Sequence, residues 1–361
     1  MTVNITKIKR EKSESARQVT LADIARESHV SLSTVSLVLR EKPGFPDETR
    51  RRVLDVAKAL GYRSRSEADP SSARHRGTKL HTLGLLVKSI AGQPPNANPF
   101  YSHVLAGIED ACRRRHVNLL YSTLPVDEHN IVVDTPRLLR DEIADGLLLI
   151  GVFVDNTLDS LLKDLELPVL LVDAYTVCGE YDAVLSDNLR GAYGAVQHLV
   201  NRGHRHIGLI GTGADAYPSI RERRMGYAQA LGDNGITERY YADCPPDAQA
   251  AAEATAALLA KHPRITAIFG CNDEVAIAAM RRAQAMGRSV PRDLSVIGFD
   301  DIDMASVVSP ALTTMRVDRV GMGRMAVQLL GYRVEFPDSE RVTSVLSPRL
   351  IERQSVVSPA E

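Results

Sequence analysis

Residues 19–63, VTLADIARESHVSLSTVSLVLREKPGFPDETRRRVLDVAKALGYR, decide the fold of the amino-terminal part of the chain. The segment divides at its own turn residues into three short helices. Thr20, followed by an aspartate three residues later, is a capping-box-like start for the first helix. A second helix begins near Ser31, and the run KPGFP ends it. Pro46 suits the first turn of a third helix, which Gly61 is placed to end.

Apolar residues recur in each helix at a spacing that places them on one face, which predicts a small three-helix core. Two short helices joined by a turn of about three residues form the helix-turn-helix pattern, whose second helix enters the DNA major groove. Hydroxyl groups at the start of that helix suit phosphate binding, but the same serines would also cap a helix in an unrelated bundle. The predicted core residues are Leu21, Ile24, Ala25, Val35, Val38, Leu39, Val53, Val56, Ala57 and Leu60.

The charge of the chain is unevenly distributed. Residues 1–65 carry 14 Lys and Arg against 8 Asp and Glu, a net charge of +6. The whole chain of 361 residues has a net charge of −1, so the remaining residues carry −7. A basic head on an acidic body indicates a polyanionic partner for the head alone. Residues 1–18 are expected to form a disordered basic tail.

From residue 83 onward, short runs of branched residues alternate with helical stretches. Ligands of parallel sheets bind outside the carboxyl ends of the strands, so polar residues that follow a strand are candidate ligand contacts. The predicted buried parallel strands are LGLLV, NLLYST, DGLLLIGV, PVLLVDA, HIGLIGT, TAIFG and LSVIGFDD, with crossover helices near 102–115, 188–202, 220–233, 247–261 and 273–286.

Membrane, secretory, metal and enzyme signatures are weak or missing from the sequence. No apolar run approaches the ~18–20 residues of a membrane span, and the amino terminus lacks the apolar segment of a secretory signal. The four cysteines form no CxxC pair, which predicts free thiols. The glycines of GLIGTG (208–213) and the histidines of HRH (204–206) suit structural roles better than nucleotide or metal binding. A cytoplasmic protein without cofactor, metal or enzymatic activity is expected.

The head resembles the DNA-binding headpiece of the lactose/galactose-repressor family. The motif VTLADIA, then HVSLSTVS, then ETRRRVLDVAKALGY carries the resemblance. It implies that hydroxyl groups and Tyr62 contact the DNA backbone, while Leu32, Ser33 and Leu37 lie at positions that read bases. Leu37 departs from the polar residue common there. The DNA-binding residues expected in the head are Thr20, Leu21, Ser31, Leu32, Ser33, Thr34, Ser36, Leu37, Arg40, Thr49 and Tyr62.

The body resembles the effector-binding core of the same family, which is similar to periplasmic sugar-binding proteins. The motifs NPFYSHVLAGIEDACRRR, DNLRGAYGAVQHLVNRGHRHIGLIG, GCNDEVAIAAMRRAQAMG and VPRDLSVIGFDD carry this resemblance. It implies two parallel-sheet α/β lobes, a chain that crosses between them three times, and a ligand in the cleft. The expected domains are the helix-turn-helix headpiece 19–63, the linker 64–80, a first lobe of 81–180 and 315–340, and a second lobe of 181–314 and 341–361.

The resemblance also implies effector contacts. Arg223 matches an arginine that holds effector oxygens, and Asp273 matches a carboxylate that accepts hydrogen bonds from effector hydroxyl or amine groups. The alternative is that these two side chains pair only with each other across the cleft. Cys244 or Pro245 occupies a position where family members often cover the ligand with an aromatic residue. The expected effector-binding residues are Phe100, Tyr101, Asp155, Ser219, Arg223 and Asp273.

These features together predict a homodimeric transcriptional repressor that a carbohydrate inducer releases from a palindromic operator. An alternative of the same architecture is a corepressor-type regulator whose ligand is a purine or a sugar phosphate. A third possibility, from another class, is a sugar-binding module or enzyme with a non-functional head.

Between head and body lies the linker GYRSRSEADPSSARHRGTK (61–79). The family usually has a hinge helix here, with a leucine that wedges into the minor groove, but this linker has no leucine. Residues 69–76 could form a short helix, with Arg74 and His75 entering an A·T-rich minor groove by charge. A flexible tether that never orders is the alternative.

Overall fold

The structure is a computed structural model of the chain. It describes residues 21–31, 34–35, 38, 46–60, 79–90, 99–127, 131–139, 143–165, 167–177, 180–213 and 216–359. These residues belong to two compact units, Met1–Arg76 and Gly77–Glu361. The expected tail 1–18 and most of the expected linker 64–80, including Arg74 and His75, lie outside the described residues.

The first unit contains α1 (Leu21–Ser28) and α3 (Asp47–Ala59), and Thr34, Val35 and Val38 between them are helical. The predicted three-segment organisation is therefore confirmed for the described residues. These segments share one apolar core, in which Ile24, Val35, Val38, Val53 and Ala57 are buried and Ala25 and Val56 are partly buried.

One predicted core residue of the head is wrong. Leu60 is 37% exposed, because α3 ends at Ala59 and Leu60 is its C-cap, beyond the buried face. The side chains of Leu21 and Leu39 lie outside the described residues.

The second unit is built on two parallel α/β sheets, as predicted, and the first of them forms lobe 1. Its six parallel strands have the order β13-β7-β5-β3-β1-β2. Branched apolar side chains alternate between the two faces of this sheet, so both faces must be shielded from water by other elements. The strands are β1 (Thr82–Ile90), β2 (Asn118–Val126), β3 (Gly146–Ile150), β5 (Val169–Val172), β7 (Asp182–Ser186) and β13 (Thr343–Leu346).

Helices cover both faces of the lobe 1 sheet. Leu83, Leu85 and Val87 of β1 pack in the core under α4 (Pro99–Arg115) and α11 (Arg319–Glu335). Leu86 packs on the opposite face, in a second core that includes residues of α5 and η1. The smaller elements of this lobe are η1 (Arg137–Leu139), β4 (Phe153–Val154), α5 (Asn156–Lys163) and β6 (Tyr175–Thr176).

Glycines let α4 and α11 come into close contact. A Cβ on Gly107 would lie 2.2 Å from the Val320 carbonyl oxygen, and a Cβ on Gly323 would lie 2.2 Å from the Val104 carbonyl oxygen. Since both distances are far below van der Waals contact, only glycine fits at either position. This close packing fixes α11, which starts beside the cleft described below.

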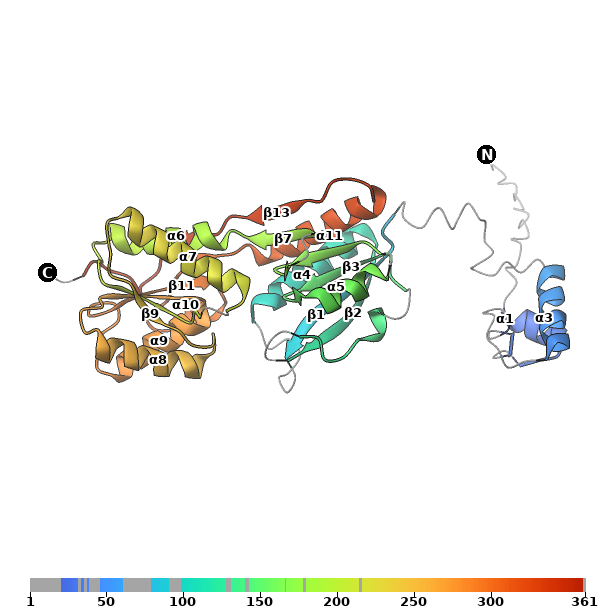
Figure 1. Ribbon diagram of the computed structural model, residues 1–361, viewed down its shortest axis with the longest axis horizontal. Helices are drawn as coiled ribbons and strands as arrows, with labels where there is room; N and C mark the ends of the chain where they lie inside the picture. Colours follow the sequence, from blue (N-terminus) through green and yellow to red (C-terminus); the bar gives the residue numbers. More distant parts are fainter. Residues whose placement is uncertain are drawn as a thin grey trace, which may run out of the picture. The chain divides into compact units, whose positions relative to one another are not determined.

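Lobe 2 is a second six-stranded sheet of order β14-β12-β11-β10-β8-β9, parallel except for β14. Figure 1 shows α6 and α7 on one side of it and α8 and α9 on the other. Its strands are β8 (Ile207–Ile210), β9 (Tyr240–Ala242), β10 (Ala267–Gly270), β11 (Ser295–Asp300), β12 (Thr313–Arg316) and β14 (Arg349–Ile351). Its helices are α6 (Asn188–Asn201), α7 (Pro218–Asp233), α8 (Ala248–Lys261), α9 (Asp273–Ala285) and α10 (Met304–Val307).

The chain passes between the two sheets three times, as expected, but each crossing comes later than the predicted boundary. β7 and β13, assigned to the second lobe from sequence, belong to the lobe 1 sheet, and all of β12 belongs to lobe 2. The crossings therefore follow residues 186, 316 and 346 rather than 180, 314 and 340. The sequence pattern did not predict β7, β12 or β13 as strands, so it could not show which of the two sheets each of them joins.

Candidate effector cleft and DNA-binding head

A cavity of about 180 Å³ lies between the two lobes, where the carboxyl ends of strands from both sheets converge. This is where ligands of open parallel sheets bind. Lobe 1 contributes Lys88 near the end of β1, residues that follow β3 and β5, and the start of α4. Lobe 2 contributes α7, residues that follow β9 and β10, and residues at and after the end of β11. The lining residues are Lys88, Pro99, Phe100, Tyr101, Gly151, Asp173, Tyr217, Ser219, Ile220, Arg223, Pro246, Asn272, Asp273, Glu274, Asp300 and Ile302.

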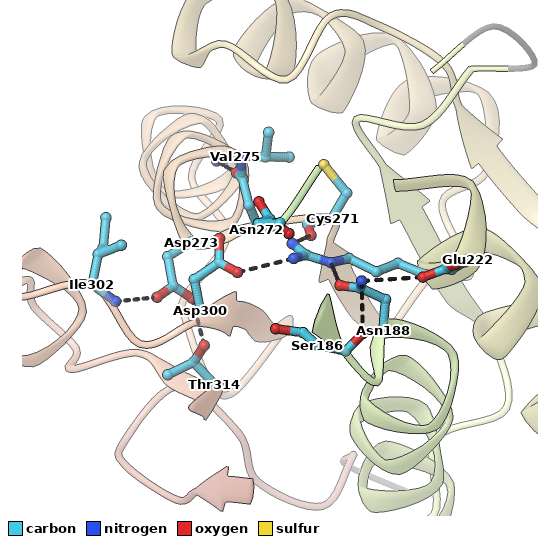
Figure 2. A network of polar contacts seen from close by, with 12 residues as sticks. Ser186, Asn188, Glu222, Cys271, Asn272, Asp273, Val275, Asp300, Ile302 and Thr314 are labelled. Atoms are coloured by element: carbon cyan, nitrogen blue, oxygen red, sulfur yellow. Dashed lines mark hydrogen bonds and ion pairs between the residues drawn. The ribbon is translucent and has the colours of Figure 1, made fainter. Parts of the chain in front are cut away.

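Arg223 on α7 is the centre of the lobe 2 wall, and it is 5% exposed. Its Nε donates to Asn188 Oδ1 at 3.0 Å, its Nη1 to the Cys271 carbonyl at 2.7 Å, and its Nη2 to Asp300 Oδ1 at 3.0 Å. Figure 2 shows these acceptors converging from three different elements. The guanidinium also stacks 3.8 Å from the centre of the Phe299 ring. Arg223 is thus held in one orientation with its charge neutralised by Asp300.

Asp273, the first residue of α9, is fully buried. Its carboxylate accepts hydrogen bonds from Thr314 Oγ1 at 2.5 Å and from the Ile302 backbone N–H at 2.8 Å (Figure 2). Burial and the neighbouring Asp300 raise its pKa well above the usual range. Arg223 and Asp273 do not pair with each other, so the alternative of a mutual ion pair is wrong. Arg223 has Asp300 as its partner instead.

The lobe 1 wall presents an aromatic pair and a carboxylate. Phe100 and Tyr101 contact edge to face, with ring centres 5.3 Å apart. Tyr101 donates its hydroxyl to Asp173 Oδ2 at 3.1 Å. That hydroxyl would lie 2.3 Å from a Cβ at Gly151, whose φ of +67° also favours glycine. Glycine at this position therefore lets the Tyr101 ring lie against the floor of the cleft.

Direct hydrogen bonds join the two lobes at the cleft. Tyr217 of lobe 2 donates its hydroxyl to the Val152 carbonyl at 2.9 Å. Tyr175 of lobe 1 donates to Glu222 of α7 at 3.3 Å. A ligand that moves the lobes has to break or rearrange these contacts.

Five of the six expected effector residues lie together in the cleft, namely Phe100, Tyr101, Ser219, Arg223 and Asp273. Asp155 does not. Its carboxylate caps α5 by accepting the Leu158 backbone N–H at 2.8 Å, and it lines a separate cavity of lobe 1. The segment VFV before it contains the short strand β4, which lies outside the main sheet, so Asp155 does not follow a main-sheet strand.

Sequence reasoning missed several cleft residues, and the signal for them was available. Asp173 follows the strand run PVLLV, and Asp300 ends the run LSVIGFD. Both obey the rule that polar residues at carboxyl ends of strands face the ligand. Lys88, Asn272 and Glu274 also line the cavity. Cys244 or Pro245 was expected at the position where family members cover the ligand with an aromatic residue. In the structure, Pro246 is the residue of this segment that lines the cavity.

The cleft is richer in carboxyl groups than in cations. Asp173, Asp273, Glu274 and Asp300 line it with only Lys88 and Arg223. Burial is the largest cause of a raised pKa for each of these carboxyl groups, and it raises the pKa of Asp173 to about 7. Burial also lowers the pKa of Lys88, which Asp173 opposes.

We expect Asp173→Asn to change the pH dependence of stability. Because the pKa of Asp173 is higher in the folded state than in the unfolded state, the folded protein binds the proton more tightly. Its contribution to stability is therefore greatest at about pH 4 and declines as the pH rises to about 7. The variant lacks this decline, so its stability relative to the unmodified protein should rise by at most about 1.4 kcal/mol per pH unit across this window. Urea unfolding at several pH values measures the difference, and a difference that does not vary with pH would show that folding leaves the pKa of Asp173 unchanged.

In the head, three expected DNA contacts are described. Ser31 Oγ accepts the Thr34 backbone N–H at 3.1 Å, so Ser31 caps the second helical segment, and the two hydroxyl oxygens lie 2.8 Å apart. Thr49 lies in the first turn of α3, partly exposed. The structure describes the backbone of Leu21 but not its side chain. The other expected contacts lie outside the described residues: Thr20, Leu32, Ser33, Ser36, Leu37, Arg40 and Tyr62.

Comparison with known proteins matches both units. Residues 20–64 match the model of bacterial regulatory proteins of the lacI family, and residues 196–356 match a periplasmic binding protein-like domain. The ribose operon repressor of Haemophilus influenzae is 32% identical over 341 residues, which cover 94% of this chain and 99% of the relative. The chain belongs to the lacI family of bacterial regulatory proteins.

Other members of the lacI family are similarly related to the chain. The HTH-type transcriptional repressor PurR of Photobacterium profundum is 32% identical over 342 residues, covering 93% of this chain and 98% of the relative. A solved lacI-family regulator from Enterococcus faecium with bound ribose has a TM-score of 0.66 and 28% identity, covering 77% of this chain and 99% of its own.

As a lacI-family member, the chain is a ligand-responsive DNA-binding repressor that acts as a dimer on operator DNA. None of the described helices is long and apolar enough to cross a membrane. The described residues also contain no cluster of three or more His, Cys, Asp or Glu side chains that could hold a metal ion.

Proposed function

We propose that the cleft binds a neutral, polyhydroxylated ligand of monosaccharide size, and that this ligand releases the repressor from a palindromic operator. The observation that carries the proposal is the excess of carboxyl groups around the cavity. Four carboxyl groups face two cations, and one of those cations, Arg223, already pairs with Asp300. Sugar hydroxyl groups donate to ionised carboxyl groups and accept from protonated ones, whereas a negatively charged ligand is repelled by those that are ionised.

Cavity size and the aromatic wall support the same ligand class. A volume of about 180 Å³ corresponds to about six water molecules at ~30 Å³ each, which suits one sugar ring. The rings of Phe100 and Tyr101 offer apolar faces to the C–H groups of such a ring. A relative named as a ribose operon repressor and a similar regulator with bound ribose make D-ribose the first probe.

The proposed DNA contacts are the head residues that the family pattern indicates, with Ser31, Thr34 and Thr49 contacting phosphates. The protein has no enzymatic role in this proposal, and it acts in the cytoplasm, where its operator lies.

Fluorescence anisotropy with the DNA upstream of the protein's own gene tests the proposal. D-ribose, cellobiose, hypoxanthine and glucose 6-phosphate are added in turn to the protein–DNA complex. Release by a neutral sugar is the expected result. Tighter DNA binding with hypoxanthine or the sugar phosphate, and no response to sugars, would instead identify a corepressor and contradict the proposal.

Salt should affect the two binding events differently. Each phosphate contact should cost a factor of about three to four in operator affinity between about 50 and 200 mM salt, because counterions are released on binding. Sugar affinity should stay unchanged, because the ligand is neutral. Operator affinity that does not respond to salt would refute the assignment of the basic head as a DNA-binding unit.

A further inference from the structure

A second cavity, of about 560 Å³, lies beside the crossover segments between the lobes. Its walls come from α4, from the end of β12 and the start of α11, and from the connection between β13 and β14. The polar groups that line it are His103, Arg316, Asp318, Arg319, Ser347 and Arg349. None of these six residues lines the effector cleft.

Arg319 is buried in this wall without a carboxylate partner. Arg319 as a whole is 7% exposed. Its Nη2 donates to the Asp301 carbonyl at 2.8 Å and its Nη1 to the Pro99 carbonyl at 3.3 Å. No carboxylate of the described residues lies within 4.0 Å of its guanidinium nitrogens. Asp300 lies near enough to Arg319 to interact with its charge but does not contact it, so an incoming anion would give this buried charge a direct partner.

Two more arginines, Arg316 and Arg349, line the same cavity. Arg316 and Arg349 are directly paired residues of the antiparallel strands β12 and β14. Like charges in such positions destabilise a sheet unless an opposite charge lies between them. Arg316 contacts Asp301 at 2.5 Å, but that carboxylate is shared with Arg353 at 2.7 Å. Arg349 forms no ion pair among the described residues.

The remaining lining groups leave this positive charge largely unbalanced. Asp318 is the only carboxyl group among the polar lining residues, and it caps α11 by accepting the Gly321 backbone N–H at 2.9 Å. His103 contacts Asp303 at 3.4 Å. Three guanidinium groups and one carboxylate give the lining a net charge of +2 with neutral His103.

We propose that this cavity binds a small phosphorylated metabolite as a second effector. A phosphate ester carries close to two negative charges at neutral pH, which matches the net charge of the lining. Guanidinium groups recognise phosphate oxygens in a planar, bidentate manner. The cavity has the volume of sites for ligands of sugar-phosphate size. The two cavities thus select ligands of opposite character, since carboxyl groups line the cleft and guanidinium groups line this site.

The two cavities are connected through Asp300 and Asp301. Both residues have positive φ values, 108° and 57°, which are uncommon for non-glycine residues. On the side of the second cavity, Arg316 pairs with the Asp301 carboxylate and Arg319 donates to the Asp301 backbone carbonyl. On the side of the cleft, Asp300 pairs with Arg223. An anion that draws Arg316 and Arg319 towards itself shifts Asp301, and with it the partner of Arg223. Phosphate binding should therefore change sugar affinity in the cleft.

Isothermal titration calorimetry on the full-length protein tests the site, with glucose 6-phosphate and inorganic phosphate as probes and glucose as the uncharged control. Arg349→Gln removes an exposed guanidinium of the cavity, and Arg292→Gln removes an exposed arginine of lobe 2 outside it. We expect glucose 6-phosphate to bind, inorganic phosphate to compete with it, and Arg349→Gln to weaken binding by about tenfold or more. Arg292→Gln should leave the affinity unchanged.

Three results would overturn the proposal. They are the absence of glucose 6-phosphate binding at millimolar concentrations, equal losses in the two arginine variants, and a weakening of glucose binding by Arg349→Gln equal to that of glucose 6-phosphate binding. The cleft variant Asp273→Asn separates this test from that of the sugar effector. It should keep glucose 6-phosphate binding, and loss of that binding would place the phosphate ester in the cleft. A failure of sugars to release DNA would contradict the cleft proposal while leaving the result for Arg349→Gln intact.

Discussion

Arg223→Lys should lower the affinity of the cleft for its sugar about 100-fold, or by roughly 3 kcal/mol. The arginine places three N–H groups on three fixed acceptors: Asn188, the Cys271 carbonyl and Asp300. A lysine ammonium cannot reproduce that planar arrangement, so Asp300 keeps at most a point-charge partner and the cleft loses its shape. Each charged hydrogen bond lost in a buried site costs about 1.5–3 kcal/mol. Calorimetry with the sugar that releases the operator measures the loss.

The neighbouring residue supplies the matched control. Arg224 on the same helix pairs with Asp243 and stacks 3.8 Å from the centre of the Tyr241 ring, outside the cleft. Arg224→Lys makes the same chemical change and should leave sugar affinity nearly unaltered. Operator affinity should be retained in both variants, which makes Arg223→Lys a repressor that no longer responds to sugar. Equal sugar affinity in the two variants would show that Arg223 only supports the fold.

Arg333→Met should destabilise the core by about 3–5 kcal/mol, because it leaves a buried carboxylate without its partner. Arg333 and Asp182 are 1% and 0% exposed and form two hydrogen bonds of 2.7 and 3.0 Å. Arg333 also donates to four backbone carbonyls of the loop between α11 and β13, and Asp182 accepts the Val342 backbone N–H at 2.8 Å. The pair therefore attaches β13, the edge strand of lobe 1, to the sheet.

Urea unfolding followed by circular dichroism measures this destabilisation. Arg324→Met on the same helix is the control, since Arg324 is half-exposed and pairs with Asp110 at the surface. Exposed ion pairs contribute less than about 1 kcal/mol. The double variant Arg333→Met with Asp182→Leu should recover part of the loss, because it removes the unpaired buried charge. A single variant no less stable than the Arg324→Met control would show that the buried pair is not needed for stability.

Much of the fold could be predicted because its signals are local. The alternation of branched runs and helical stretches located β1, β8 and β11 with their helices, and turn residues divided the head into its three segments. The sheet to which β13 belongs depends instead on β7, a partner more than 100 residues away. The prediction that Leu60 is buried was wrong for a different reason. Its spacing fits the core face of α3, but the helix ends just before it.

The cleft shows the same division between local and long-range information. The family resemblance placed Arg223 and Asp273 in the cleft, and the rule that polar residues at the carboxyl ends of strands contact the ligand would have added Asp300. The choice of Asp300 over Asp273 as the partner of Arg223 is set by how β11 and α9 lie in three dimensions. Asp155 was misplaced because nothing in the run LLLIGVFV shows that the main strand ends at Ile150.

We expect the cleft and the head to be thermodynamically coupled. The most direct test of this coupling is the affinity of the full-length protein for the releasing sugar, measured by calorimetry with and without saturating operator DNA. Coupling is reciprocal, so the sugar should bind the DNA-bound repressor more weakly by the same factor by which it weakens operator binding. Equal sugar affinities in the two titrations would contradict the account.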